Sequence, residues 1–253
     1  MMKRKNKKLV RIFAGVVAIA LIGGILFITN AFVGNPISAM MANKAIQKYV
    51  NENYSFLDLE VEKATYNFKD SSYFAMAKSR TSIDTQFAIY YQSGKVQRDD
   101  YEGYVVEKFN TLTRLSEEYS FIAKSIIARE LGYENNTTMV MFDMDDHERN
   151  MELLELDMKF DKAIPIDAEV TIRLDLQDYS IETLAKVLTD AHQAFVDNDC
   201  HFYKYGLYAE NNDTYVMVND VSPADIESGE LVNLLEEAKH NDNPLGISVF
   251  IKE

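Results

Sequence analysis

The hydrophobic pattern divides the chain near residue 34. No residue from Ile12 to Asn43 carries a charge, and residues 12–29 read IFAGVVAIALIGGILFIT. With its apolar neighbours on both sides, this run reaches the roughly 20 residues that are needed to cross a bilayer core. The pattern therefore predicts one transmembrane helix over residues 9–33, which would contact the lipid bilayer.

The flanks of this run predict its orientation. Residues 1–11 contain six Lys and Arg and no acid. The positive-inside rule then makes residues 1–8 a cytoplasmic tail and places everything after Val33 outside the membrane. A cleaved signal peptide is the alternative, with cleavage between Ala31 and Phe32. Signal peptides usually have a shorter apolar core, of about 7–15 residues, so the length favours an uncleaved anchor.

A helical period begins after the membrane segment. Asn35 and Pro36 are typical of a helix start, because Asn caps free amide groups and proline suits the first turn. The next residues place an apolar stripe on one helix face, formed by Ala42, Ala45, Ile46, Tyr49 and Val50. The opposite face carries Lys44, Gln47, Lys48 and Asn51. We expect this helix to be separate from the membrane helix and to pack on a folded domain.

Three strand-like segments follow, LDLEVEKATYNFK, YFAMAKSR and TQFAIYYQ. A long helix is predicted from about Tyr104 to Leu131, where Gly132 ends it. This order of elements predicts an N-terminal α+β domain over residues 34–135.

The rest of the chain repeats this style. Its predicted strands are TTMVMFDM, LLELDMKFD, AEVTIRLDLQD, the hairpin pair HFYKYGLYA and TYVMVND, and GISVFIK. Amphipathic helices are predicted over residues 180–197 and from Ser222 to a stop before Pro244. This order predicts a C-terminal α+β domain over residues 136–253. The predicted fold class is α+β: an N-terminal single transmembrane helix followed by two small α+β domains with antiparallel sheets.

Charge and cysteine content narrow the function classes. The net charge is −14, and outside residues 1–11 only 20 basic residues face all 40 acidic ones. A body this acidic repels phosphate backbones, so we expect no nucleic-acid partner. The single cysteine, Cys200, excludes an intramolecular disulfide, so the domains must hold by packing.

Short motifs beside the membrane segment resemble a known family. They are FVGNPISAMMANKAIQKYVNENY at residues 32–54 and YNFK at Tyr66–Lys69. Their order and spacing resemble the YfjL-like family of membrane-anchored proteins of Gram-positive bacteria, a family without an assigned biochemical role. The resemblance covers residues 1 to about 95, and the later part follows the family in layout. It implies an extracytoplasmic location and supplies no catalytic residues.

The segment DMDDHE is the densest group of potential metal ligands. Its oxygen-rich side chains are of the kind that hold a hard cation, and the candidate ligands are Asp143, Asp145, Asp146, His147 and Glu148. The segment lacks the EF-hand spacing. Adjacent loop residues seldom point at one ion, so a solvated turn is the competing interpretation.

Other reactive residues favour structural roles. His192 lies on the inward stripe of its helix and is expected to be a hydrogen-bonded core residue. Cys200 and His201 could be a nucleophile and its base, but neighbours on a strand point to opposite faces. One hairpin concentrates tyrosines, either as an aromatic platform for a ligand or as cross-strand pairs that stabilise it: Tyr203, Tyr205, Tyr208 and Tyr215.

The sequence contains no nucleophile-elbow, Walker A or dinucleotide-binding motif. We therefore expect a non-enzymatic binding or interaction module on the outer face of the cell membrane. It would have no cofactor, and its partner would be an unknown protein or envelope component. The alternatives are a cell-envelope hydrolase or metal-dependent enzyme that uses the Asp143–Glu148 cluster, and a structural part of a larger membrane complex.

Overall fold

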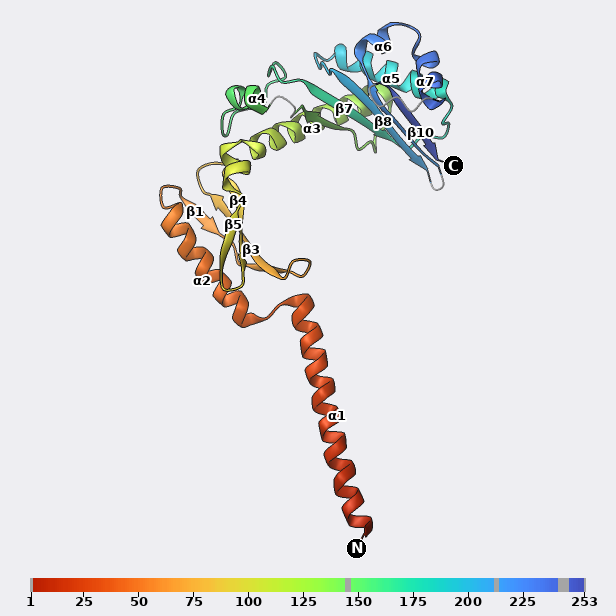
Figure 1. Ribbon diagram of the computed structural model, residues 1–253. Helices are drawn as coiled ribbons and strands as arrows, with labels where there is room; N and C mark the ends of the chain where they lie inside the picture. Colours follow the sequence, from red (N-terminus) through yellow and green to blue (C-terminus); the bar gives the residue numbers. More distant parts are fainter. Residues whose placement is uncertain (1, 144–146, 212–213, 241–245, 253) are drawn as a thin grey trace. The chain divides into compact units, whose positions relative to one another are not determined.

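The computed structural model describes residues 2–143, 147–211, 214–240 and 246–252 (Figure 1). The chain divides into two compact units, Met1–Glu107 and Lys108–Glu253. Both units combine helices with a β-sheet, so the predicted α+β class is confirmed. The division lies earlier than the expected boundary at residues 135–136, because helix α3 (Phe109–Leu131) packs its buried face in the core of the second unit.

The first helix, α1 (Met2–Val33), contains the apolar run. Among the described residues, one helical region is long and apolar enough to cross a membrane, and none of its most apolar window is buried. A second helix, α2 (Pro36–Asn53), starts directly after it, and the Asn35 side chain caps this helix by accepting from the Ser38 amide over 2.8 Å. The predicted break between two separate helices is thus confirmed.

The first unit places α2 on a small antiparallel sheet. Its strands are β1 (Leu59–Val61), β2 (Thr65–Asn67), β3 (Ser72–Ser79), β4 (Gln86–Gln92) and β5 (Lys95–Asp99). The sheet order is β1-β3-β4-β5, and β2 also pairs with β3. Ala42, Ile46 and Val50 of α2 are buried against the sheet, so the predicted apolar stripe of this helix is its packing face.

The helix that the sequence predicts from Tyr104 is interrupted. The π-helical turn η1 (Glu102–Val106) comes first, and α3 begins at Phe109. Lys108 separates them with a φ of 57°, a left-handed conformation that a continuous α-helix does not contain. The change from the first unit to the second occurs at this residue.

The second unit carries the larger sheet. Its further elements are β6 (Met139–Phe142), α4 (His147–Leu153), β7 (Ala168–Leu174), α5 (Ile181–Val196), β8 (Lys204–Asn211), β9 (Thr214–Val221), α6 (Pro223–Glu227), α7 (Leu231–His240) and β10 (Ser248–Lys252). The sheet order is β10-β9-β8-β7-β6. All pairs are antiparallel except β7 with β8, which run parallel because α5 crosses over between them.

Two sequence predictions in this unit are wrong. The segment LLELDMKFD forms no strand: its first residue ends α4, and Asp157 turns the chain with a φ of 60°. The helix predicted from Ser222 is two helices, because Gly229 has a φ of 76° and ends the first of them. The first of them begins at Ser222 as predicted, where Ser222 and Asp225 form a capping box. Pro244, the predicted stop, lies outside the described residues.

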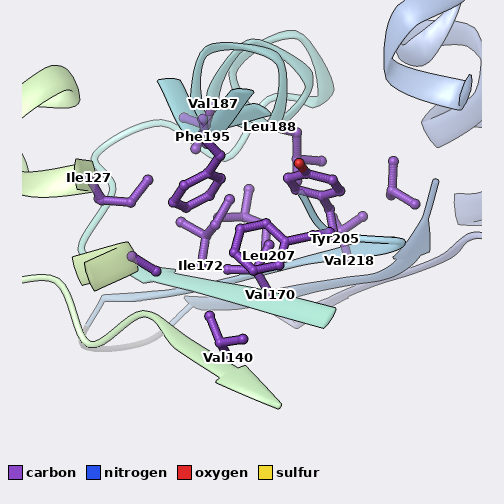
Figure 2. Close-up of a cluster of buried hydrophobic side chains, with 14 of the residues drawn as sticks. Ile127, Val140, Val170, Ile172, Val187, Leu188, Phe195, Tyr205, Leu207 and Val218 are labelled. Atoms are coloured by element: carbon purple, nitrogen blue, oxygen red, sulfur yellow. The ribbon is translucent and has the colours of Figure 1, made fainter. Parts of the chain in front are cut away.

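The core of the second unit lies on one face of its sheet. Alternate strand residues such as Val170, Ile172 and Val218 point towards Leu188 and Phe195 of α5 (Figure 2). Helices α5, α6 and α7 lie on one side of the strands (Figure 1), and the buried residues of α3 join the same cluster. We call the covered side the inner face and the opposite side the outer face.

Candidate functional site

The predicted metal cluster is only partly described. Asp143 follows β6, where its backbone carbonyl accepts from the Asn150 side chain over 2.6 Å, and Glu148 is exposed in the first turn of α4. Asp145, Asp146 and the side chain of His147 lie outside the described residues. Within the described part of the chain, no group of three or more His, Cys, Asp or Glu side chains could hold a metal ion. The metal site therefore stays a prediction.

His192 is a core residue, as predicted. Its side chain is buried, its Nδ1 lies 2.8 Å from the Tyr205 hydroxyl, and its Nε2 lies 3.2 Å from Oε1 of Glu227. The ring also packs edge-on against Tyr205, with 5.2 Å between centroids. These contacts join α5, β8 and α6, so the His192 imidazole connects the two helices to the sheet by hydrogen bonds.

Cys200 and His201 do not form a catalytic pair. Cys200 is fully buried, and burial raises the pKa of its thiol, whereas the neighbouring His201 is exposed. The two residues lie on the connection before β8 rather than on the expected strand, which starts at Lys204. They nevertheless occupy different environments, as the prediction required. A buried thiol with a raised pKa is a poor nucleophile.

The tyrosines of the hairpin divide between the two faces of the sheet. Tyr205 points into the core, and Tyr208 and Tyr215 lie on the outer face with 6.2 Å between ring centroids. The expected cross-strand aromatic pairing is confirmed for these two. The row continues to Phe250 of β10, whose ring lies 5.4 Å from that of Tyr215 and which is 51% exposed. Met217 lies between β8 and β10 on the same face.

Cations flank this aromatic row. The Arg173 guanidinium lies 5.7 Å from the ring centroid of Tyr208, and Nζ of Lys252 lies 5.9 Å from that of Tyr215. Arg173 is opposite Tyr208 in the parallel register, and Lys252 is opposite Tyr215 in the antiparallel one. The outer-face row, formed by Tyr208, Tyr215, Met217 and Phe250, thus spans three strands. It has a cation at both ends, and the exposed Glu210 on the same face accepts from the Tyr208 hydroxyl over 2.6 Å.

A bulge makes a hollow beside this row. Asn219 and Asp220 of β9 stand opposite the single residue Gly206 of β8, and Asp220 adopts a φ of 61°. A Cβ at Gly206 would lie 3.4 Å from Thr171 Oγ1, in van der Waals contact with its neighbour. The hollow has a volume of about 250 Å³, and its polar lining includes Glu169, Thr171, Lys204, Asn219 and Asp220.

Lys204 does not neutralise both acidic side chains of the hollow. Lys204 donates to Asp220 over 2.8 Å, and this hydrogen bond raises the pKa of the ammonium group. Burial raises the pKa of Glu169, and Asp220 and Asp143 raise it further, against an opposing effect of Lys204. Burial and then Asp143 raise the pKa of Tyr203 to about 12. Glu169 is therefore a carboxyl group whose charge is only partly compensated, and it suits a hydrogen-bond donor or a cation from a ligand.

Sequence reasoning missed both Phe250 and Gly206. Phe250 stands in the polar phase of the strand GISVFIK, and a large aromatic residue at a solvent-facing position was the available signal. Gly206 interrupts the alternating strand HFYKYGLYA, and an isolated glycine in a strand indicates a bulge or a close approach. Their proximity depends on strand order, which a single sequence does not specify.

Comparison with known proteins places the chain in a family. Residues 7–100 match the family model of the YfjL-like N-terminal domain, and residues 118–236 match that of the YfjL-like C-terminal domain. No curated protein and no solved structure matches the chain. The two family models agree with the two structural units in order and cover most of the sequence. The chain belongs to the YfjL-like family.

Proposed function

We propose that this protein is a membrane-anchored, non-enzymatic binding module whose body lies outside the cytoplasmic membrane. The outer face of the second sheet is the proposed binding surface, and its ligand is a protein partner. The observation that carries this proposal is the outer-face row of Tyr208, Tyr215, Met217 and Phe250, in which Met217 and Phe250 are exposed, beside the hollow that Glu169 lines.

The apolar helix α1 and its basic flank support the topology. The helix is long enough to cross a bilayer, and the Lys and Arg residues that precede it favour a cytoplasmic N-terminus. The domain-bearing part of the chain would then face the exterior. Family membership is consistent with an anchored protein.

The composition of the outer-face row supports protein binding. Tyr, Met, Phe and Arg are enriched in protein interfaces, where aromatic rings supply large contact areas. Met217 on β9 and Phe250 on the edge strand β10 expose 36% and 51% of their surface. The partly compensated carboxyl of Glu169 would add specificity for a Lys or Arg of the partner. The described part of the Asp143–Glu148 segment adds no second observation in favour of a metal-dependent enzyme.

Photocrosslinking in cells tests the binding surface. A photoreactive benzoylphenylalanine replaces Met217 in one full-length variant and Val232 of α7 in another, because these side chains are 36% and 37% exposed. We expect a discrete adduct from position 217 that position 232 does not form. Adding Phe250→Glu should remove the adduct. Identical products from both positions, or none from position 217, would contradict the proposed surface.

Thiol labelling tests the topology independently. Lys186→Cys places a thiol on the exposed surface of α5, and Asn6→Cys places one before the apolar run. In intact cells we expect a membrane-impermeant reagent to label the first variant, and the second only after lysis. The buried Cys200 provides a low background in both. The reverse labelling pattern would overturn the orientation, and a soluble product beginning at Phe32 would show signal cleavage.

A further inference from the structure

The joint between α1 and α2 is held by the first sheet. The Asn35 amide donates to the Tyr73 hydroxyl over 2.9 Å, and that hydroxyl donates to the Asn35 carbonyl over 3.1 Å. The Tyr66 hydroxyl reaches the Ala31 carbonyl over 3.2 Å. Gly34 has a φ of 71°, and a Cβ there would lie 2.5 Å from the Tyr73 hydroxyl. The chain therefore leaves α1 through a braced turn and not through a free linker.

Exposed apolar side chains surround this joint. They lie at the end of α1, on the first turns of α2 and on the turn between β2 and β3, and we call them the basal patch: Phe32, Ile37, Met40, Met41 and Phe68. Each exposes between 50% and 67% of its surface. The rings of Phe32 and Phe68 lie 5.9 Å apart, which joins the α1 end to the β2–β3 turn. An exposed apolar group of this kind indicates a contact surface.

The outward side of α2 is apolar at its start and basic further along the helix. It begins with Ile37 and Met41, and continues with Lys44 and Lys48 on the same side of the helix. At 1.5 Å per residue, the apolar part from Ile37 to Met41 measures about 6 Å. A bilayer of about 40–45 Å with a hydrocarbon core of about 30 Å has a headgroup layer of about 5–8 Å on each side. With α2 standing along the bilayer normal, the apolar part would match the thickness of that layer.

Charge in this region also suits a phospholipid surface. The first acidic residue of the chain is Glu52, near the far end of α2, although the protein contains 40 acids. Lys44 and Lys48 follow the apolar part of α2, and Lys69 adjoins Phe68. Lys44 and Lys69 can extend their ammonium groups towards phosphate while their methylene stems lie on apolar material, whereas Lys48 pairs with Glu52 over 3.6 Å. One acidic side chain, the exposed Asp70, lies on the same turn as Phe68 and Lys69, where it accepts from the Ser72 hydroxyl over 2.8 Å.

From these observations we propose that the basal patch is seated in the headgroup layer of the same bilayer that α1 crosses, so that the first unit is docked on the lipid surface. Continuity with α1 favours lipid as the occupant, because Phe32 belongs both to the patch and to the last turn of the membrane helix. The inference rests on the membrane anchoring proposed above. Docking and the braced joint would together fix the orientation of the first unit on the membrane.

Tryptophan reporters test this seating, because the chain has no tryptophan of its own. The full-length Phe68→Trp variant is reconstituted in vesicles of phosphatidylethanolamine and phosphatidylglycerol that contain brominated acyl chains as quenchers. The matched control is Phe56→Trp, since Phe56 is 71% exposed and lies beyond the opposite end of α2. A third variant, Phe27→Trp, reports on α1 alone.

We expect the Phe68→Trp emission to be blue-shifted and quenched severalfold more than that of Phe56→Trp. Equal, water-like emission from these two variants, with Phe27→Trp quenched, would overturn the seating and leave the anchor intact. Loss of quenching in Phe27→Trp as well would instead show that the anchoring proposal fails. A blue shift of Phe68→Trp that is not quenched by brominated lipid and grows with protein density would assign the patch to a second copy and also overturn the proposal.

Discussion

The two units differ in what holds helices on a sheet. In the first, the apolar contacts of α2 are supplemented by hydroxyl groups: Tyr49 and Tyr54 both donate to the Asp99 carboxylate, over 2.5 and 2.9 Å. In the second, four helices and the sheet share one continuous apolar core, in which His192 and Tyr205 make a polar contact. Apolar packing scales with buried area, whereas a carboxylate at a helix–sheet contact depends on each of its donors.

This difference suggests separate tasks. The second unit has a core large enough to leave its outer face free for exposed aromatic residues. The first unit has less apolar area to bury, and hydrogen bonds from the Tyr73 and Tyr66 hydroxyls hold its joint with α1. The unit that carries the proposed binding face and the unit that carries the proposed membrane seat should therefore respond differently to mutation.

The largest expected effect is in the second core. Phe195→Ala removes a fully buried ring from the contact between α5 and the sheet, which should destabilise the second unit by about 3–5 kcal/mol. Hydrogen exchange of the full-length protein, read by mass spectrometry, would show the loss in β7 and β8 peptides. The adjacent Val196→Ala, at a partly exposed position, should have a small effect. Equal effects at the two positions would contradict the assigned packing face.

A smaller effect is expected in the first core. Ile46→Ala empties a fully buried position between α2 and the sheet, at a cost of about 2–5 kcal/mol. Lys48→Ala on the outward side loses only the exposed 3.6 Å ion pair with Glu52, worth at most about 0.5 kcal/mol. Urea unfolding of each variant measures the difference. If Ile46→Ala and Lys48→Ala lower the free energy of unfolding equally, α2 does not pack on the sheet.

Sequence patterns predicted the elements whose formation depends on residues close together in the chain. The charge-free run predicted α1, the cap at Asn35 predicted the start of α2, and apolar spacing predicted α5 and β7. The failures came where tertiary structure decides. LLELDMKFD alternates like a strand yet turns at Asp157, and Lys108 takes a left-handed conformation inside an amphipathic pattern.

The candidate site was less predictable than the fold. The burial of His192 followed from its position on a helical stripe, but its partners Tyr205 and Glu227 lie on other elements. Parallel pairing of β7 with β8 brings Arg173 opposite Tyr208, and β10 at the edge brings Phe250 to the same row. Periodicity assigns each residue to a face of its own strand, but it contains no information about which strands are neighbours.

Alkaline pH should distinguish the units through Tyr54. Burial, followed by the Asp99 carboxylate, raises the pKa of this hydroxyl in the folded state. Unfolded tyrosine ionises near pH 10, so the folded state retains more protons above that pH and its stability falls as pH rises. Tyr54→Phe should weaken this fall for the first unit.

At neutral pH, Tyr54→Phe should cost about 1.5–3 kcal/mol, because it removes a hydrogen bond to a charged group. Unfolding curves between pH 7 and pH 11, with hydrogen exchange to separate the units, test both effects. The second unit serves as the internal control, since its own alkaline response should not change. An unaltered response of the first unit would mean that the Asp99 contact does not couple to its stability.

The smallest expected effect is that of Glu169→Gln, which separates binding from folding on the outer face of the second sheet. Burial, opposed by Lys204 and reinforced by Asp220 and Asp143, raises the pKa of Glu169. A raised carboxyl pKa means that the folded state binds its proton more tightly, so stability is present below the unfolded value and is lost as pH rises through the folded one. Glu169→Gln should remove this loss and change stability at neutral pH by no more than about 0.5 kcal/mol, in the stabilising direction.

The exposed Glu236→Gln on α7 is the control and should leave the pH profile of unfolding unchanged. A Glu169→Gln protein that is clearly less stable would show that this carboxyl serves the fold, whereas a more stable protein with a weaker photocrosslink at position 217 would show that it is kept for the partner.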